Sequence, residues 1–119
     1  MISGTDDVNL SASVEPEPTL KVAPLPDGSG YSLTGTIDLS TAATARDRLD
    51  AAWRPGATVA LELSGLEFMD STGLNLICRG LATLGDRGSL VLRNPRRIVR
   101  RILAVSGIVD RPNVRLAEG

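Results

Sequence analysis

Short runs of alternating apolar and polar residues recur along the chain, and longer stretches with helical spacing separate most of them. Residues 20–23 and 31–37 each have the pattern of a short strand. The segment PLPDGSG, which lies between them, is rich in turn-forming residues. We therefore predict that the two strands pair as a hairpin.

Two helices are predicted in the middle of the chain. The first begins at Ser40, which can act as its N-cap, and runs to about Trp53, where a Pro-Gly pair at 55–56 ends it. Its stripe consists of Ala42, Ala45, Leu49 and Ala52. The second ends at Gly85, and its stripe consists of Leu74, Ile77, Cys78, Leu81 and Leu84. Gly80 inside this helix costs about 1 kcal/mol relative to alanine, and we ascribe it to close packing against the sheet.

Three more strands are predicted at residues 59–63, 90–92 and 113–116, with a loop at 64–66 after the first of them. Asn94 and Pro95 have the N-cap and N1 chemistry of a third helix, which ends near residues 106–107. Helices that alternate with strands indicate parallel neighbours. The expected fold class is α/β: a single mixed, mainly parallel sheet with helices packed against it, preceded by a short N-terminal hairpin.

Composition excludes several classes of function. The 119 residues suit one domain, and an apolar share of 42% suffices for a core. The chain has no histidine, which excludes Ser-His-Asp and Cys-His catalysis and histidine-ligated metals. Cys78 is the single cysteine, so we interpret it as a small core residue. A net charge of −1 and three aromatic residues argue against nucleic-acid binding.

No apolar stretch reaches the ~20 residues that a membrane span needs, and the N-terminus has no basic region followed by an apolar one. We expect a cytoplasmic protein without a membrane span.

The first 18 residues differ from the rest. They contain Asp6, Asp7, Glu15 and Glu17, no basic residue and little apolar periodicity. We expect an acidic, disordered leader at residues 1–18 and one folded domain at residues 19–119. Four arginines at 96, 97, 100 and 101 belong to the third predicted helix. Such a face is most often solvated, but cations near a helix N-terminus oppose its dipole, so the acidic leader is a candidate partner for them.

Polar residues follow the strands at one edge of the predicted sheet. Loops after the carboxyl ends of parallel strands share an edge, where binding sites collect. The residues expected at this rim are Asp38, Ser40, Asp70, Ser71, Thr72 and Asn94. In the segment FMDSTG, two hydroxyls and a glycine stand at the start of an apolar helix. Either Asp70 or Ser71 is simply an N-cap, worth about 1 kcal/mol, or a hydroxyl there accepts a phosphate that switches a docked partner off.

Three segments in the same order resemble the STAS domain of anti-sigma factor antagonists: LTGTIDLSTA at 33–42, LEFMDSTGLNLI at 66–77 and RRILAVSGI at 100–108. The resemblance implies a STAS-like fold and a non-enzymatic, partner-switching regulator. The implied partner is an anti-sigma factor with serine/threonine kinase activity, which binds the ATP, so no cofactor is expected on this chain. Unmodified protein would bind the kinase and free a sigma factor, and a phosphatase would reset the phosphorylated form.

The resemblance also assigns residues. The second hydroxyl of the D-[ST]-[ST]-G loop is the phosphorylation site, here Thr72, and Ser71 is the alternative acceptor. The expected partner-binding residues are Asp38, Ser40, Asp70, Ser71, Gly73 and Asn75. No catalytic residue and no metal ligand is predicted, and the oligomeric state stays open.

Other functions fit parts of the sequence. The chain also resembles the stand-alone STAS accessory subunit of lipid-transport ABC complexes, in which the same loop contacts an ATPase without phosphate chemistry. Nucleotide or anion binding at the rim lacks a Gly-rich Walker loop. Acid–base or metal chemistry by Asp38 and Asp70 lacks a nearby lysine, because the only lysine is Lys21 on the first strand.

Overall fold

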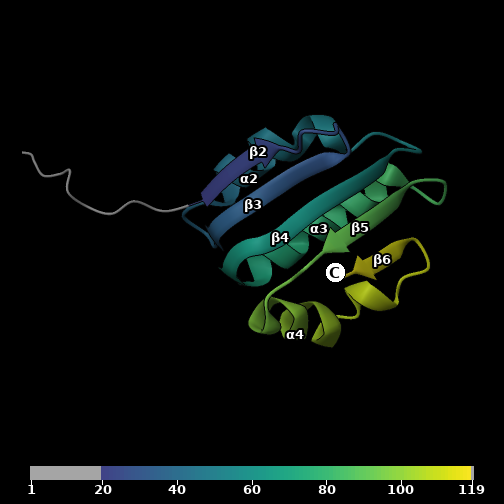
Figure 1. Cartoon of the computed structure of the whole chain (residues 1–119). Coiled ribbons are helices and arrows are strands. Elements are labelled where there is room, and N and C mark those ends of the chain that lie inside the picture. The colour runs from purple at the N-terminus through teal and green to yellow at the C-terminus, as the bar shows by residue number, and fades with distance from the viewer. Residues whose placement is uncertain (1–19, 119) are drawn as a thin grey trace, which may run out of the picture.

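The computed structural model describes residues 20–118, so the predicted acidic leader lies outside the described residues. Five strands form one sheet in the order β2-β3-β4-β5-β6 (Figure 1). They are β2 (Leu20–Pro24), β3 (Gly30–Ile37), β4 (Thr58–Met69), β5 (Ser89–Arg93) and β6 (Val114–Ala117). The pair β2–β3 is antiparallel and the other three pairs are parallel, which confirms the predicted hairpin and mainly parallel sheet.

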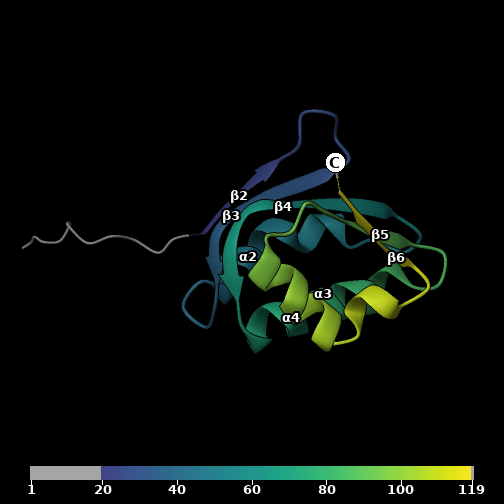
Figure 2. The ribbon, with the colours of Figure 1, turned by 60° about the horizontal axis from the view of Figure 1, so that its bottom comes forward.

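The three α-helices of residues 20–118 cover the same face of this sheet (Figure 2). They are α2 (Ala42–Leu49), α3 (Ser71–Leu84) and α4 (Arg97–Val105), and two 3₁₀ turns, η1 (Asp50–Ala52) and η2 (Ile108–Asp110), follow α2 and α4. The core between the layers contains Leu33, Leu61, Leu63, Leu90 and Leu92 from the strands and Leu49, Ile77, Leu84 and Leu103 from the helices. Within residues 20–118, no helix is long and apolar enough to cross a bilayer.

Strand β4 is longer than the sequence predicted. The expected loop at residues 64–66 is wrong, because β4 continues to Met69 and stays paired with β3. The register shifts twice, and each shift adds one residue to β4 opposite β3. An extra residue reverses which face the following side chains occupy. Leu63, Leu66 and Met69 are therefore all buried although they lie three residues apart.

The starts of two helices also differ from prediction. Ser40 does not cap α2; the N-cap position is Thr41, and its side chain makes no cap hydrogen bond. Asn94 does not cap α4, which begins at Arg97. Asn94 instead has a left-handed backbone with φ of 52°, and its amide donates to Glu62 Oε2 at 3.2 Å.

Gly80 is buried inside α3, but its close neighbour is not the sheet. A Cβ built on Gly80 would lie 2.5 Å from Cδ2 and Cε2 of Trp53, the residue that follows η1. The prediction that Gly80 packs closely is therefore right about the crowding and wrong about the partner. Cys78 is half-buried at the border of the core.

Candidate functional site

Asp38 and Asp70 lie side by side at the ends of two neighbouring strands. Ile37, the last residue of β3, pairs with Met69, the last residue of β4. The backbone N–H of Asp70 donates to the carbonyl oxygen of Ile37 at 3.1 Å. The parallel pairing of β3 and β4 thus brings the two acids together, and α2 and α3 begin just after them.

The carboxylate of Asp38 organises the loop before α2. Its Oδ1 accepts hydrogen bonds from the hydroxyl of Ser40 at 2.7 Å and from the N–H groups of Ser40 at 2.9 Å and Thr41 at 3.2 Å. The hydrogen bond from the Ser40 hydroxyl is the largest effect on the pKa of Asp38 and lowers it. Burial opposes this, the backbone N–H groups of Ser40 and Thr41 add to the lowering, and the pKa stays below its ordinary value. Thr41 is buried and donates to the carbonyl of Thr36 at 2.9 Å, which fastens the loop to the end of β3.

Asp70 caps α3 and also holds the hydroxyl of Thr72. Its Oδ1 accepts the backbone N–H of Thr72 at 2.8 Å, which is N-cap geometry. The same oxygen accepts the Thr72 hydroxyl at 2.5 Å. Thr72 is half-buried and the neighbouring Ser71 is exposed. The Thr72 oxygen therefore has a fixed direction, while its two lone pairs remain on the side away from the donated proton.

Gly73 allows α3 to start this close to the sheet. A Cβ at Gly73 would lie 3.0 Å from Cβ of Met69 and 3.2 Å from Cγ2 of Ile37, so even alanine would push on two buried side chains. Two residues further along, Asn75 is exposed. The dipole of α3 places its positive end at the rim, where the side chain of Asp70 accepts the N–H of Thr72 and the Asp70 carbonyl accepts those of Gly73 and Leu74.

Two exposed apolar side chains belong to this rim, and the sequence did not single out either of them as a site residue. Leu39, between Asp38 and Ser40, is 81% exposed, and Phe68 near the end of β4 is 41% exposed. Leu39 is the better candidate for a contact, because it is the more exposed of the two and adds little to the packing of the domain. The sequence signal that could have identified Leu39 is its position in a loop, outside the apolar faces of both predicted helices.

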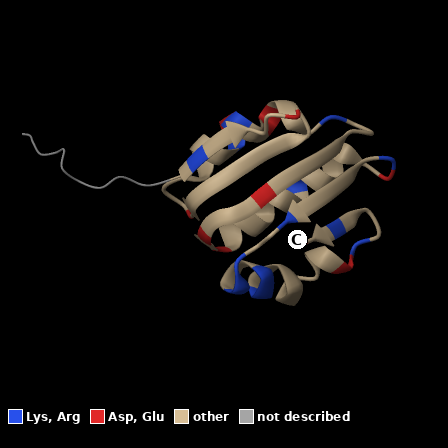
Figure 3. Ribbon diagram, viewed as in Figure 1, with Lys and Arg blue, Asp and Glu red and all other residues tan. Residues whose placement is uncertain are grey.

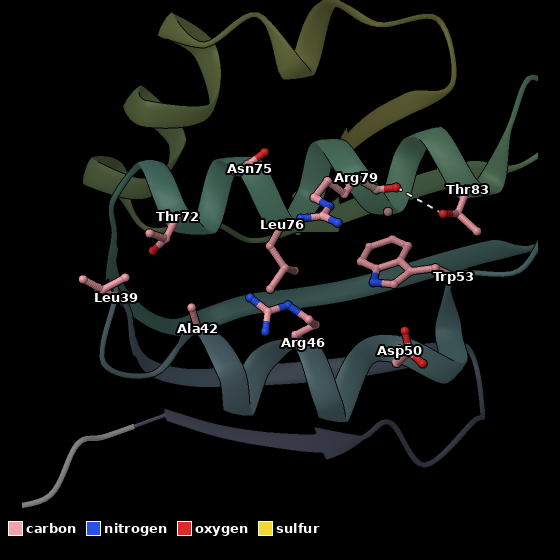
Figure 4. Close-up of a pocket in the computed structure, with 11 residues that line it drawn as sticks. Leu39, Ala42, Arg46, Asp50, Trp53, Thr72, Asn75, Leu76, Arg79 and Thr83 are labelled. Carbon is pink, nitrogen blue, oxygen red and sulfur yellow. Dashed lines mark hydrogen bonds between the residues drawn. The ribbon is translucent and has the colours of Figure 1, made fainter.

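A groove of about 320 Å³ extends from the rim between α2 and α3 (Figure 4). Its residues are Leu39, Ala42, Arg46, Asp50 and Trp53 on one side and Thr72, Asn75, Leu76, Arg79, Gly80 and Thr83 on the other. The guanidinium groups of Arg46 and Arg79 point into it from opposite helices (Figure 4). The sequence indicated only that Arg79 lies on the solvent-exposed face of its helix. Which helix lies across the groove depends on tertiary packing and could not be predicted.

A family model described as "Mlab, STAS domain" matches residues 26–116. The chain belongs to the STAS domain family. Among curated proteins, none matches the sequence. A crystal structure of an anti-sigma factor antagonist from Mycobacterium paratuberculosis has 27% identity and a TM-score of 0.62, over 82% of this chain and 84% of that one.

Two further solved structures share the fold. A putative anti-sigma factor antagonist from Thermotoga maritima has 19% identity and a TM-score of 0.61, over 84% of this chain and 86% of that one. The anti-sigma factor antagonist SpoIIAA, in its unphosphorylated form, has 21% identity and a TM-score of 0.62, over 83% and 88% of the two chains. The STAS-like architecture predicted from the sequence is confirmed.

Asn94 does not join the rim of this STAS domain. Glu62 of β4 pairs with Arg93, so β4 continues for seven more residues beyond Glu62 after β5 has ended. At about 3.3 Å per residue, Asp70 lies roughly 20 Å further along the strand than Asn94. The prediction that all three loops share one rim is wrong for Asn94.

The arginines at positions 96, 97, 100 and 101, at the start of and within α4, form a separate basic cluster of the STAS domain (Figure 3). Arg96 Nε donates to the carbonyl of Ser64 at 2.9 Å, and Arg100 forms an ion pair with Glu118. Arg97 and Arg101 are exposed. Two of the four arginines, Arg96 and Arg100, are thus engaged within the domain. An interaction of the cluster with the acidic leader stays a prediction, because residues 1–18 lie outside the described residues. Over residues 20–118, no group of three or more metal-ligating side chains gathers.

Proposed function

We propose that this STAS domain is an anti-sigma factor antagonist whose binding to a serine/threonine kinase anti-sigma factor is controlled by phosphorylation of Thr72. The observation that carries the proposal is the Thr72 hydroxyl, which Asp70 holds at the start of α3 beside the Asp38 loop. The proposed partner-binding surface comprises Asp38, Ser40, Asp70, Ser71 and Asn75, together with the exposed Leu39, and the buried Gly73 lets α3 start beside them. The anti-sigma factor antagonist from Mycobacterium paratuberculosis supports this assignment.

The phosphoryl transfer makes limited demands on this chain. The Thr72 oxygen forms a bond to the γ-phosphorus of ATP held by the kinase, the bond from that phosphorus to the β–γ bridging oxygen breaks, and ADP leaves. The hydroxyl proton passes to a base of the kinase. The chain contributes an oriented oxygen, because the hydrogen bond to Asp70 selects one rotamer of Thr72.

The added charge acts on the partner more than on the fold. A phosphate brings about −1.5 to −2 charges, and the dipole of α3 favours a negative charge at this end of the helix. It also stands beside Asp38 and Asp70, so an acidic partner surface would meet three anions in place of two. Like charges forced together at an interface cost several kcal/mol, and about 1.4 kcal/mol is tenfold in affinity. The modified form is therefore released, and a phosphatase returns it to the binding form.

A phosphorylation assay tests this proposal directly. The chain is incubated with ATP and a kinase-type anti-sigma factor, and the modified residue is mapped by mass spectrometry. We expect label on Thr72 and loss of label in Thr72→Ala, whereas Ser71→Ala, which removes the alternative acceptor, should still carry its label on Thr72. Thr72→Ala should bind the kinase constitutively, whereas Thr72→Glu should bind it more weakly. Equal affinities for the two variants, or label that persists in Thr72→Ala, would contradict the proposal.

One observation favours a second function. The matching family model carries the description "Mlab, STAS domain", and the chain resembles the accessory subunit of lipid-transport ABC complexes. In that role the rim would bind a transport ATPase, and phosphate on Thr72 would not be required. Binding to a transport ATPase that is unchanged in Thr72→Val, without binding to a kinase-type anti-sigma factor, would select this alternative.

A further inference from the structure

Two cationic side chains are directed toward the end of the groove where Thr72 lies. Because β3 and β4 end side by side, α2 and α3 both begin at the same rim. Side chains on a helix tilt toward its N-terminus. Arg46 follows Ala42 by one turn and Arg79 follows Thr72 by two turns, and all four residues line the groove. The guanidinium of Arg46 accordingly lies over the groove on the side of Ala42 (Figure 4).

Neither arginine has an anionic partner within the described residues. The ion pair found there joins Arg100 and Glu118, which do not line the groove, and no hydrogen bond from the Arg46 or Arg79 side chain is formed in residues 20–118. Asp50 lines the far end of the groove, whereas Asp38 and Asp70 stand at its mouth with one oxygen each engaged in local hydrogen bonds. The groove therefore presents two guanidinium groups from opposite walls to anything anionic that enters from the Thr72 end.

We propose that phosphothreonine 72 is bound within the same molecule by Arg46 of α2, with Arg79 of α3 adding positive potential. This inference rests on the proposed function, since it requires Thr72 to be modified. Repulsion by Asp38 and Asp70 directs the phosphate away from the rim, and the two arginines attract it into the groove. The planar guanidinium of Arg46 can donate two parallel hydrogen bonds to phosphate oxygens, which a lysine could not do.

This contact changes what phosphorylation accomplishes. A phosphate bound to Arg46 links α3 to α2 across the groove and closes its mouth between Leu39 and Thr72. A partner that inserts a side chain into the groove would be excluded because the phosphate fills the site, in addition to any repulsion by its charge. The switch would then work on a neutral partner surface, which repulsion alone does not explain.

The test uses the full chain with phosphothreonine installed at position 72 by chemical ligation, so that it does not depend on any kinase. The phosphate is titrated by ³¹P NMR in the wild-type sequence, in Arg46→Gln and in the control Arg48→Gln, which alters an exposed arginine on α2 that does not line the groove. We expect the titration midpoint to lie at lower pH in wild type and Arg48→Gln than in Arg46→Gln. The rise in melting temperature on phosphorylation should be about 2–4 °C smaller in Arg46→Gln, the size of a partly exposed ion pair in a domain of this length.

A second measurement keeps the inference testable if a variant folds poorly. In the wild-type chain, the Nε–H resonance of Arg46 should shift and become protected from exchange on phosphorylation, while that of Arg48 should not. Identical phosphate titrations in all three proteins, together with an unchanged Arg46 resonance, would overturn the inference and leave the proposed function standing. Failure of a kinase to label Thr72 would instead count against the proposed function.

Discussion

Replacing Gly80 with alanine should destabilise the domain, although alanine is the better helix former. Gly80 lies in the middle of α3 and is buried beneath the indole of Trp53. A Cβ there would lie 2.5 Å from two ring atoms and 2.6 Å from a third. Ordinary contacts between carbon atoms are roughly 3.5–4.0 Å, so the ring would have to move by about 1 Å.

The magnitude follows from two opposing effects. Alanine in place of glycine stabilises a helix by about 1 kcal/mol. Overpacking against a fixed neighbour costs roughly 1–3 kcal/mol. Gly80→Ala should therefore lower the free energy of unfolding by about 1 kcal/mol. In a Trp53→Ala background the clash is absent, and the same substitution should raise the free energy of unfolding by about 1 kcal/mol.

Urea denaturation followed by circular dichroism measures all four proteins of this double-mutant cycle. The exposed Ala82→Gly substitution on α3 is the matched control for helix propensity and should cost about 1 kcal/mol. Trp53 is the single tryptophan, so its fluorescence emission reports directly whether the ring is displaced in Gly80→Ala. Stabilisation by Gly80→Ala with Trp53 in place, or the same sign in both backgrounds, would refute the reasoning.

Three more predictions concern the rim. Asp70→Ala should lower the free energy of unfolding by about 1 kcal/mol, because α3 loses its cap, and urea denaturation checks this. The pKa of Asp38 is lowered in the folded state, so the contribution of its carboxylate to stability is complete above about pH 4 and is lost as the pH falls through the folded pKa. The melting temperature of Asp38→Asn should therefore fall less between pH 7 and pH 3 than that of the wild type. Leu39→Ala should weaken kinase binding about tenfold or more by calorimetry and leave the melting temperature unchanged, because the side chain is solvated in the free protein.

The fold could be predicted because its signals are local and consistent. The turn-rich segment at 24–30, the alternation in Val59, Leu61 and Leu63, and the spacing of Leu74, Ile77 and Leu81 each indicate one kind of element. The length of β4 could not be predicted. Two extra residues interrupt the alternation of buried and exposed side chains in β4. They remain part of the strand only because the backbone of β3 continues to pair with β4 along this stretch.

The site could be predicted in part, for a topological reason. Two parallel neighbours that end together bring Asp38 and Asp70 together, and strand order was enough to expect that. The prediction for Asn94 was wrong because β5 ends well before β4 does. How far one strand extends beyond its neighbour cannot be read from the sequence of either strand alone. The groove between Arg46 and Arg79 was missed because it depends on how two helices lie against each other.

The same carboxylates serve the fold and are available to a partner, which explains why the sequence pattern alone fits both a helix cap and a docking site. In each case it is Oδ1 that accepts the local hydrogen bonds: from Ser40 and Thr41 to Asp38, and from Thr72 to Asp70. Asparagine keeps that acceptor and replaces the second oxygen by a donor, whereas alanine removes both. If Asp38 only orders the loop before α2 and Asp70 only caps α3, both positions should tolerate Asp→Asn. A rim that binds a partner through the outer oxygen should lose affinity in the same folded variants, so the two roles separate at the level of one atom.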